Sequence, residues 1–305
     1  MERREIEALL ELPLPELIAY ADKVRAEETG SRVELCNILN AKSGMCPEDC
    51  KFCAQSARHH TDASTYPLKT KGEMLEAARR AKEIGASRFD IVTSGNALTK
   101  EEVSSIAEAV SEITRDIGIK MCASLGRLDE ECLALLKKAG LSRYHHNIET
   151  SPRYYPKIVT THSFDERLST IRAAKKAGLE VCSGGIIGMG EQWQDRIDMA
   201  LILKELDVDS IPINILVPIK GTAFENVKPL SPIDAVRTIA IFRIILKNKI
   251  IKIAAGRESA LKDFQALAFM AGANGMLIGG YLTIRGRAVE DDLKLVEEVE
   301  RAWQR

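Results

Sequence analysis

The stretch KKAGLEVCSGGI, residues 175–186, decides the fold because it joins the end of a helix to the start of a strand. Its lysines suit a helix C-terminus, and its glycine suits the left-handed position that ends many helices. Two other stretches repeat the design, KEIGASRFDIV at 82–92 and KKAGLSRYHHNI at 137–148. Each predicts an amphipathic helix that runs into an apolar strand, which is the repeating unit of α/β proteins.

The same alternation extends along the chain. Helix starts are marked by the capping boxes at 99–102 and 163–166 and by Ser231-Pro232. Eight strands alternating with helices predict a TIM (β/α)8 barrel. An open doubly wound sheet is the alternative, but no glycine-rich dinucleotide fingerprint follows the first strand. The predicted strands lie near 33–38, 88–94, 119–125, 142–148, 179–187, 210–217, 250–256 and 275–282.

Composition places the chain among globular cytoplasmic enzymes. It has 305 residues, 45% of them hydrophobic and 29% charged, with a net charge of −1. This near-neutral charge does not favour nucleic acid or an anionic membrane as the main partner. No segment is apolar enough to span a membrane or to act as a secretory signal. We expect residues 1–305 to form a single domain, with residues 1–30 as a helical lead-in packed on the barrel.

Polar and sulfur-bearing residues recur in or just after the predicted strands. In a TIM barrel the carboxyl ends of the strands build the active site. Because buried polar groups need partners, we expect these side chains to share one site. They are Cys36, Asp90, Cys122, Asn147, Glu149, Cys182, Asn214 and Arg257.

The segment CPEDCKFC, residues 46–53, follows the first predicted strand and carries three cysteines at C-x3-C-x2-C spacing. Three thiolates can hold three corners of a 4Fe–4S cluster and leave the fourth iron open. A zinc site with His59 or His60 as the fourth ligand is the alternative. The chain has seven cysteines, and this odd number argues against a disulfide framework in a large intracellular chain.

This spacing, with Phe52 before the last cysteine, resembles the signature of the radical S-adenosylmethionine superfamily. The surrounding sequence resembles the biotin synthase family over nearly the whole chain. The resemblance implies a sulfurtransferase that converts dethiobiotin to biotin. The matching stretches are CPEDCKFCAQSARHHT (46–61), YHHNIETSPRYYPKIVTTHSFDERLSTI (144–171), VCSGGIIGMGE (181–191), PINILVPIKGT (212–222), AAGRE (254–258) and FMAGANG (269–275).

The resemblance also implies residue roles. Cys46, Cys50 and Cys53 would bind the radical-generating cluster. Asn147 and Asn214 would bind the ureido ring of the substrate. The alternative is that these asparagines, which lie at strand ends, only cap backbone groups. Thr283 or Arg285 would hold the substrate carboxylate, and a solvated surface arginine is the alternative for Arg285. S-adenosylmethionine would be bound by Phe52, Ser94, Gly95, Glu149, Gly184, Ile186, Gly188 and Glu191.

The chain departs from the family at a second, auxiliary iron–sulfur cluster. The family's usual ligands are three cysteines and an arginine, and here Cys122, Cys182 and Arg257 are assigned to three of those places. The fourth is Asp90, whose carboxylate is a poorer ligand for iron in this chemistry. We hypothesise that Cys36, on the neighbouring strand, replaces the missing thiolate. The iron count of this cluster stays open, from 2Fe–2S to a larger variant.

Two other function classes remain as alternatives at this stage. One is a related radical enzyme without sulfur insertion, such as an amino-acid mutase or a hydrogenase maturase. The other is a non-enzymatic zinc or iron–sulfur protein. The resemblance further implies a flavodoxin or ferredoxin as electron donor and a homodimer. Cys132 shares an apolar helical stripe with Leu136 and is expected to pack on the outside of the barrel.

Overall fold

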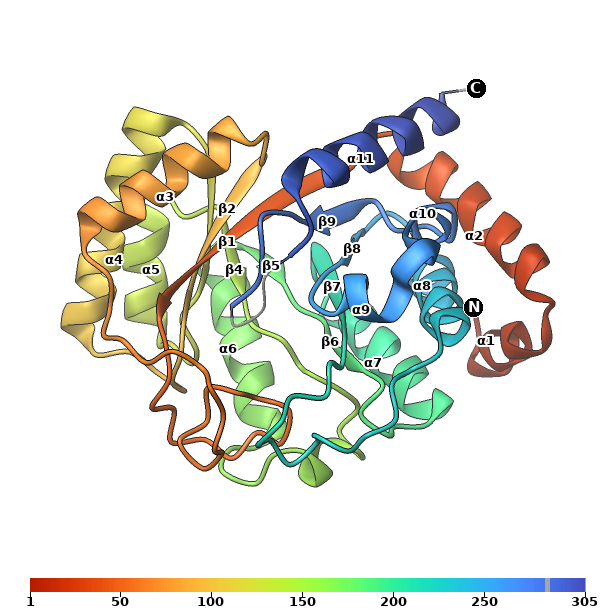
Figure 1. The fold of residues 1–305 in the computed structure, drawn as a ribbon, viewed down its shortest axis with the longest axis horizontal. Helices are drawn as coiled ribbons and strands as arrows, with labels where there is room; N and C mark the ends of the chain where they lie inside the picture. Colours follow the sequence, from red (N-terminus) through yellow and green to blue (C-terminus); the bar gives the residue numbers. More distant parts are fainter. Residues whose placement is uncertain (283–285, 305) are drawn as a thin grey trace.

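The computed structural model describes residues 1–282 and 286–304. Its centre is a closed ring of parallel strands (Figure 1), and the prediction of a TIM barrel is confirmed. The strands pair in the order β5-β4-β3-β2-β1-β9-β8-β7-β6, and a further pairing of β5 with β7 closes the ring. Their bounds are β1 Glu34–Lys42, β2 Arg88–Thr93, β3 Lys120–Ser124, β4 Arg143–His145, β5 Glu180–Cys182, β6 Gly185–Ile187, β7 Ser210–Ile215, β8 Ile250–Ile253 and β9 Gly275–Leu277.

Strands β5 and β6 together occupy one position in the ring. The predicted strand 179–187 is interrupted at Ser183 and Gly184, and both halves pair with β7. A Cβ atom on Gly184 would lie 2.0 Å from the carbonyl oxygen of Pro212 in β7. Glycine is therefore required here because the neighbouring backbone comes too close for any side chain.

The helices surround the strands and start where the sequence predicts. Thr99 and Ser163 form capping boxes, and Ser231 caps a helix whose first residue is Pro232. The helix bounds are α1 Arg3–Ala8, α2 Leu14–Thr29, α3 Lys71–Glu83, α4 Lys100–Glu112, α5 Glu130–Lys138, α6 Phe164–Lys176, α7 Trp193–Glu205, α8 Pro232–Leu246, α9 Arg257–Leu261, α10 Gln265–Met270 and α11 Val289–Trp303.

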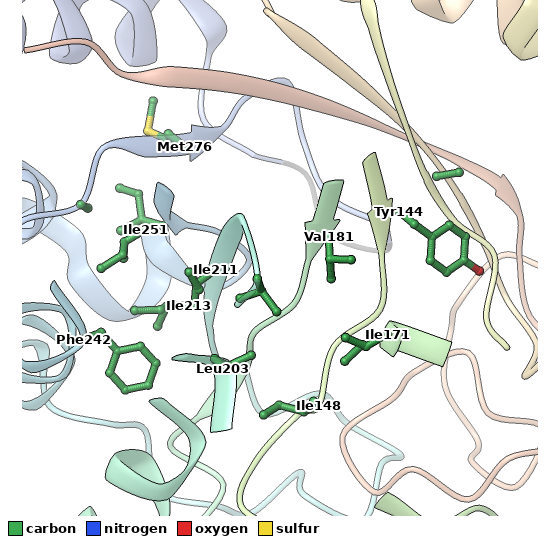
Figure 2. Packing of buried hydrophobic residues seen from close by; sticks show 14 of the residues in the cluster. Tyr144, Ile148, Ile171, Val181, Leu203, Ile211, Ile213, Phe242, Ile251 and Met276 are labelled. Atoms are coloured by element: carbon green, nitrogen blue, oxygen red, sulfur yellow. The ribbon is translucent and has the colours of Figure 1, made fainter. Parts of the chain in front are cut away.

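Each strand presents one set of side chains to the helices and the other to the barrel interior. The helix-facing set is apolar and forms the core with residues such as Leu203 of α7 and Phe242 of α8 (Figure 2). It includes Phe89, Ile91, Met121, Tyr144, Val181, Ile211, Ile213, Ile251 and Met276. The side chains at the intervening positions point into the barrel, and several of them are polar or carry sulfur.

The N-terminal helices pack on the outside of the barrel. Helix α2 lies against α8 and α10 (Figure 1). The guanidinium of Arg25 lies 3.9 Å from the ring centroid of Trp303 in α11, and Arg237 of α8 donates to the carbonyl of Leu12. In the described part of the chain, no helix has the length and hydropathy needed to cross a membrane.

A buried ionic layer fills the barrel interior toward the amino ends of the strands. Glu34 of β1 accepts hydrogen bonds from Arg88 of β2 at 2.8 Å and from Arg143 of β4 at 2.7 Å, and lies 3.2 Å from the ammonium of Lys252 in β8. Glu180 at the start of β5 accepts from both arginines, at 2.8 and 2.9 Å. Burial raises the pKa of Glu34, but Lys252, Arg143 and Arg88 outweigh it and lower this pKa to about 2.

A second buried ion pair attaches the last helix to the barrel. Arg257, at the start of α9, donates to Asp292 of α11 at 2.5 Å. Neither side chain is more than 1% exposed. Arg257 also donates to Gln265 and to the carbonyl of Leu277. The guanidinium therefore points outward from the ring toward α11.

We expect Asp292→Ala to lower the free energy of unfolding by about 3 kcal/mol, because it leaves Arg257 as a buried charge without its main partner. Urea unfolding followed by circular dichroism measures this change. The matched control is Glu298→Ala on the same helix, which breaks an exposed ion pair with Arg301 and should have a much smaller effect. Equal losses in the two variants would contradict the role of the buried pair.

Candidate functional site

A cavity of about 710 Å³ opens at the carboxyl ends of the strands. It is lined from nearly every position of the ring and from the loop after β1. Thirteen of the residues singled out from the sequence share it, which supports the expectation of one common site. They are Cys36, Cys46, Cys50, Phe52, Cys53, Asp90, Ser94, Gly95, Asn147, Glu149, Cys182, Ile186 and Asn214.

The three-cysteine loop is held by its own backbone. Cys46 N–H donates to the Gln55 carbonyl at 3.2 Å, and the Cys46 carbonyl accepts from Ala57 N–H at 2.8 Å. Cys53 N–H donates to the Cys50 carbonyl at 3.0 Å. Burial raises the pKa of Cys53 to about 11 and also raises that of Cys50. Both are neutral thiols without metal, so iron binding must release their protons.

Acidic residues within this loop fasten it to the segment that follows β4. Asp49 accepts from the backbone N–H groups of Thr160 at 2.9 Å and Thr161 at 3.2 Å. Glu48 lies 2.6 Å from Nδ1 of His162, and Nε2 of His162 lies 2.9 Å from a guanidinium nitrogen of Arg167. Burial lowers the pKa of His162, consistent with a neutral ring that accepts from Arg167 and donates to Glu48.

Arg167 of α6 lines the cavity, although the sequence analysis did not single it out. It donates to the hydroxyl of Tyr155 at 2.7 Å and to the carbonyl of Asn147 at 3.0 Å. Its nearest charged partner in the cavity is Glu149, at 3.6 Å. Its negative partners raise the pKa of Arg167 despite burial, so a fixed cation lies beside Glu149 and Cys50. The signal was present in the resemblance stretch 144–171, which contains Arg167.

Glu149 has the geometry of a ligand-binding carboxylate. Its backbone φ is +68°, in the left-handed region that non-glycine residues rarely occupy. Its buried Oε2 atom has no hydrogen-bond partner among the described residues. Such strain and such an unsatisfied acceptor tend to occur where a ligand completes the site. Burial raises the pKa of this carboxyl group.

The two predicted asparagines line the cavity but also cap backbone groups. Asn147 accepts from Gly184 N–H at 3.0 Å. Asn214 donates to the Gly185 carbonyl at 3.2 Å and accepts from Ala255 N–H at 3.1 Å. The capping alternative weighed from the sequence is therefore observed. The side-chain amide of Asn214 thus makes one hydrogen bond as donor and one as acceptor to backbone groups. Each of the two asparagine amides can make further hydrogen bonds, which are available to a ligand.

The G-x-I-x-G-x-x-E stretch is only partly in the cavity. Ile186 lines it, whereas Gly184, Gly188 and Glu191 are not among its lining residues. Glu191 is buried, accepts from the backbone of Gly188 and Met189, and pairs with Arg196 at 2.7 Å. Glu191 therefore shapes the backbone that follows Ile186, and direct contacts of Gly184, Gly188 and Glu191 with S-adenosylmethionine stay a prediction.

Three cysteines lie deeper in the barrel, just above the ionic layer. Cys36 and Cys182 line the cavity floor, and Cys122 lies below it, with its sulfur 4.0 Å from a guanidinium nitrogen of Arg88. Burial raises the pKa of Cys36 to about 12 and that of Cys122 as well. Burial also raises the pKa of Asp90 to about 7, and its Oδ1 atom lacks a hydrogen-bond partner within the described ranges.

Arg257 lies outside the cavity lining, and its guanidinium is paired with Asp292. Cys122 is likewise absent from that lining, so the ligand role of Arg257 stays a prediction. Lys252, five residues earlier in β8, lines the cavity together with Cys36 and Cys182. Burial lowers the pKa of Lys252, but Cys36, Cys182 and Glu34 outweigh it and raise this pKa. Thr283 and Arg285, predicted to hold a substrate carboxylate, lie outside the described residues.

The zinc alternative has little geometric support. Across residues 1–282 and 286–304, no three His, Cys, Asp or Glu side chains converge closely enough to hold one metal ion. His59 is directed at the carbonyl of Cys53, with 2.8 Å between its Nδ1 atom and that oxygen. A 4Fe–4S cluster has a separate iron for each thiolate, so the donor set of the loop fits a cluster better than a single ion.

Comparisons with known proteins agree with this site. The family model of the radical SAM superfamily matches residues 42–203, and that of the biotin and thiamin synthesis associated domain matches residues 212–301. The biotin synthase of Thermotoga petrophila is 50% identical over 294 residues, covering 96% of this chain and 97% of that protein. The biotin synthase of Pelotomaculum thermopropionicum is 49% identical over 286 residues, covering 94% and 89%.

Solved structures with the same fold have other activities. Methylornithine synthase superposes with a TM-score of 0.84 at 23% identity, covering 97% of this chain and 91% of that one. A maturase of the FeFe-hydrogenase superposes with a TM-score of 0.82 at 17% identity, covering 98% and 72%. At such identities the likeness shows the shared barrel and does not support the alternative of a mutase or maturase.

We expect Cys50→Ala to remove about four irons per chain from anaerobically reconstituted protein, because one cubane loses a corner ligand. Chemical iron and sulfide analysis measures this loss. Cys132→Ala is the matched control, since Cys132 is buried in the apolar core on α5, away from the cavity. An iron content in Cys50→Ala equal to that of the control would contradict the ligand assignment.

Proposed function

Since this chain belongs to the biotin synthase family, we propose that each group of residues around the cavity has a distinct part in that family's reaction. The chain converts dethiobiotin to biotin, replacing two C–H bonds with one bridging sulfur. Its cofactors are a 4Fe–4S cluster, S-adenosylmethionine and an auxiliary iron–sulfur cluster. The observation that supports the residue roles is that the three loop cysteines and two deeper ones, Cys36 and Cys182, line one cavity.

The loop cysteines fit the radical-generating cluster. Cys46, Cys50 and Cys53 supply three soft ligands on a loop that its own backbone and Asp49 already hold in place. When bound, this cluster and S-adenosylmethionine supply the radical that removes hydrogen from the substrate, and the auxiliary cluster supplies the sulfur. The protein's task is to hold these groups around the substrate at fixed positions.

The surroundings of Glu149 fit S-adenosylmethionine. In our proposal, the unpartnered oxygen of Glu149 accepts from the ribose hydroxyls, and the fixed cation of Arg167 holds the methionyl carboxylate. Phe52, Ser94 and Gly95 line the same cavity and complete the pocket with Ile186. The Ser94 hydroxyl donates to the Gly44 carbonyl at 2.9 Å, which ties this pocket to the start of the cysteine loop.

The deeper thiols fit the auxiliary cluster. Cys36, Cys122 and Cys182 come from β1, β3 and β5 and are buried beside cations that offset the charge of thiolates. Cys36 takes the ligand place that Asp90 cannot fill well. Lys252 lines the cavity with Cys36 and Cys182 and is a cation of this site, and Arg257 stays the ligand that the family resemblance implies.

The substrate and partners follow from the family and from the remaining polar groups. Asn147 and Asn214 present amides to the cavity, and a cyclic urea needs both a donor and an acceptor. Thr283 or Arg285 would hold the substrate carboxylate. A flavodoxin or ferredoxin as electron donor, a homodimer and a cytoplasmic location complete the proposal on family grounds.

The function is tested with anaerobically reconstituted protein, S-adenosylmethionine, a reductant and dethiobiotin. Biotin and 5′-deoxyadenosine are measured by mass spectrometry, and iron by Mössbauer spectroscopy. Six to eight irons per chain, as a rough count for two clusters, together with biotin formation support the proposal. About four irons and deoxyadenosine without biotin would contradict it.

We expect Cys36→Ala to lose the auxiliary cluster and biotin formation while it keeps the radical cluster and cleavage of S-adenosylmethionine. The physical reason is that Cys36 is the thiol that compensates for Asp90. Mössbauer spectra and product analysis measure both effects in one sample. If the iron content and biotin yield match those of Cys132→Ala, Cys36 is not a ligand.

We expect Arg167→Gln to weaken binding of S-adenosylmethionine by about 10- to 100-fold, because a charge-assisted hydrogen bond is worth about 1.5–3 kcal/mol. Equilibrium binding to the reconstituted protein measures the affinity. The matched control is Arg172→Gln on the same helix, since Arg172 does not line the cavity. An unchanged affinity with intact iron content would exclude Arg167 as the carboxylate partner.

A further inference from the structure

Three cations lie beside the deep cysteines. Arg88 is paired in register with Cys36 of the neighbouring strand, and Arg143 is paired in register with Cys122. Lys252 lines the cavity together with Cys36 and Cys182. The three side chains are at most 5% exposed. We call Arg88, Arg143 and Lys252 the cationic floor.

Two carboxylates hold the cationic floor in place. Glu34 contacts all three cations, and Glu180 contacts the two arginines. Within this cluster the positive groups exceed the carboxylates by one, and Asp90 is a further buried carboxyl group near Cys36 and Cys122. The Glu180 side chain is 43% exposed, so solvent screens its charge more than it screens the buried cations.

One cation of the floor contacts a cysteine sulfur directly, and a second acts on two cysteines through its charge. A guanidinium nitrogen of Arg88 lies 4.0 Å from the sulfur of Cys122. Lys252 interacts electrostatically with Cys36 and with Cys182. Lys252 has one carboxylate within ion-pair distance in the described chain, Glu34 at 3.2 Å, so its remaining donors are free to face the cavity.

We propose that the cationic floor sets the reduction potential of the auxiliary cluster, with Glu34 as the positioning residue that keeps its cations beside the sulfur ligands. This inference rests on the proposed auxiliary site. Thiolate-bound clusters become more negative on reduction, and a fixed cation in a low-dielectric interior stabilises the more negative state. The floor therefore raises the potential and favours electron uptake at the cluster that gives up its sulfur.

A purely structural role for the same residues is the competing explanation. Buried ion networks also occur where they only satisfy one another, and they contribute little net stability. The two explanations differ in what they require of the cluster, because only the electrostatic role links the cations to its potential. Surrounding charges and hydrogen bonds are known determinants of iron–sulfur potentials.

The test compares Lys252→Met with Lys252→Arg in fully reconstituted protein. Methionine keeps the length of the side chain and removes the charge, whereas arginine keeps the charge. Redox titrations followed by electron paramagnetic resonance give the midpoint potential of each cluster. The radical cluster is the internal reference, and Arg143→Gln with Arg143→Lys repeats the comparison at a second cation.

We expect the neutral variants to shift the auxiliary potential to more negative values, the charged variants to stay near the wild type, and the radical cluster to stay unchanged. Loss of the auxiliary cluster in the neutral variants alone also supports the proposal, because it shows that the site requires the charge. An unmoved potential, or equal cluster loss in the neutral and the charged variants, overturns it. A wild-type protein with no auxiliary cluster instead overturns the proposed site on which the inference rests.

Discussion

The contact of Glu34 with three buried cations makes the polar interior of this barrel possible. A charge enclosed by the strands has little water around it, and without a partner it would cost several kcal/mol. Glu34 meets Arg88, Arg143 and Lys252 from three different strands, so one carboxylate joins β1 to β2, β4 and β8. The cysteines and the open cavity lie above this layer and depend on it for a rigid and electrically balanced base.

The two cysteine groups are supported in different ways. Cys36, Cys122 and Cys182 belong to strands, where pairing with neighbours fixes the backbone. Cys46, Cys50 and Cys53 belong to a loop, which depends on side chains such as Asp49 and Glu48 for its attachment to residues 160–162. The deep site is therefore as rigid as the barrel, whereas the position of the outer site follows the segment after β4.

Sequence patterns predicted the fold well because glycine-ended helices and apolar strands are local features. They also placed most cavity residues, since strand ends converge in a barrel. The different positions of Lys252 and Arg257 have a physical cause. The two residues are close in sequence, but Lys252 lies within β8, whereas Arg257 starts a helix after Gly256. A lysine within an apolar strand was the sequence signal for a buried cation inside the barrel.

Other differences arise from contacts that one sequence does not contain. Gly184 was expected to bind S-adenosylmethionine, but the backbone of Pro212 occupies the space that a side chain at this position would take. Arg167 lies on a helix that otherwise covers the barrel from outside, and only the fold shows that its side chain reaches the cavity. Arg88 and Arg143 follow Ser in two of the repeated stretches, but their shared partner Glu34 is far away in sequence.

The register of the strands has a consequence for how this chain can change over evolutionary time. Glu34 and Cys36 share one face of β1, and Leu35 between them packs on the helices. Inserting or deleting one residue inside such a strand would exchange the two faces and move charge and sulfur into the apolar core. Strand lengths are therefore close to fixed. Outside the cysteine segment at 46–53, the residues between β1 and α3 have no such alternation to preserve, so variation in length is expected to accumulate there.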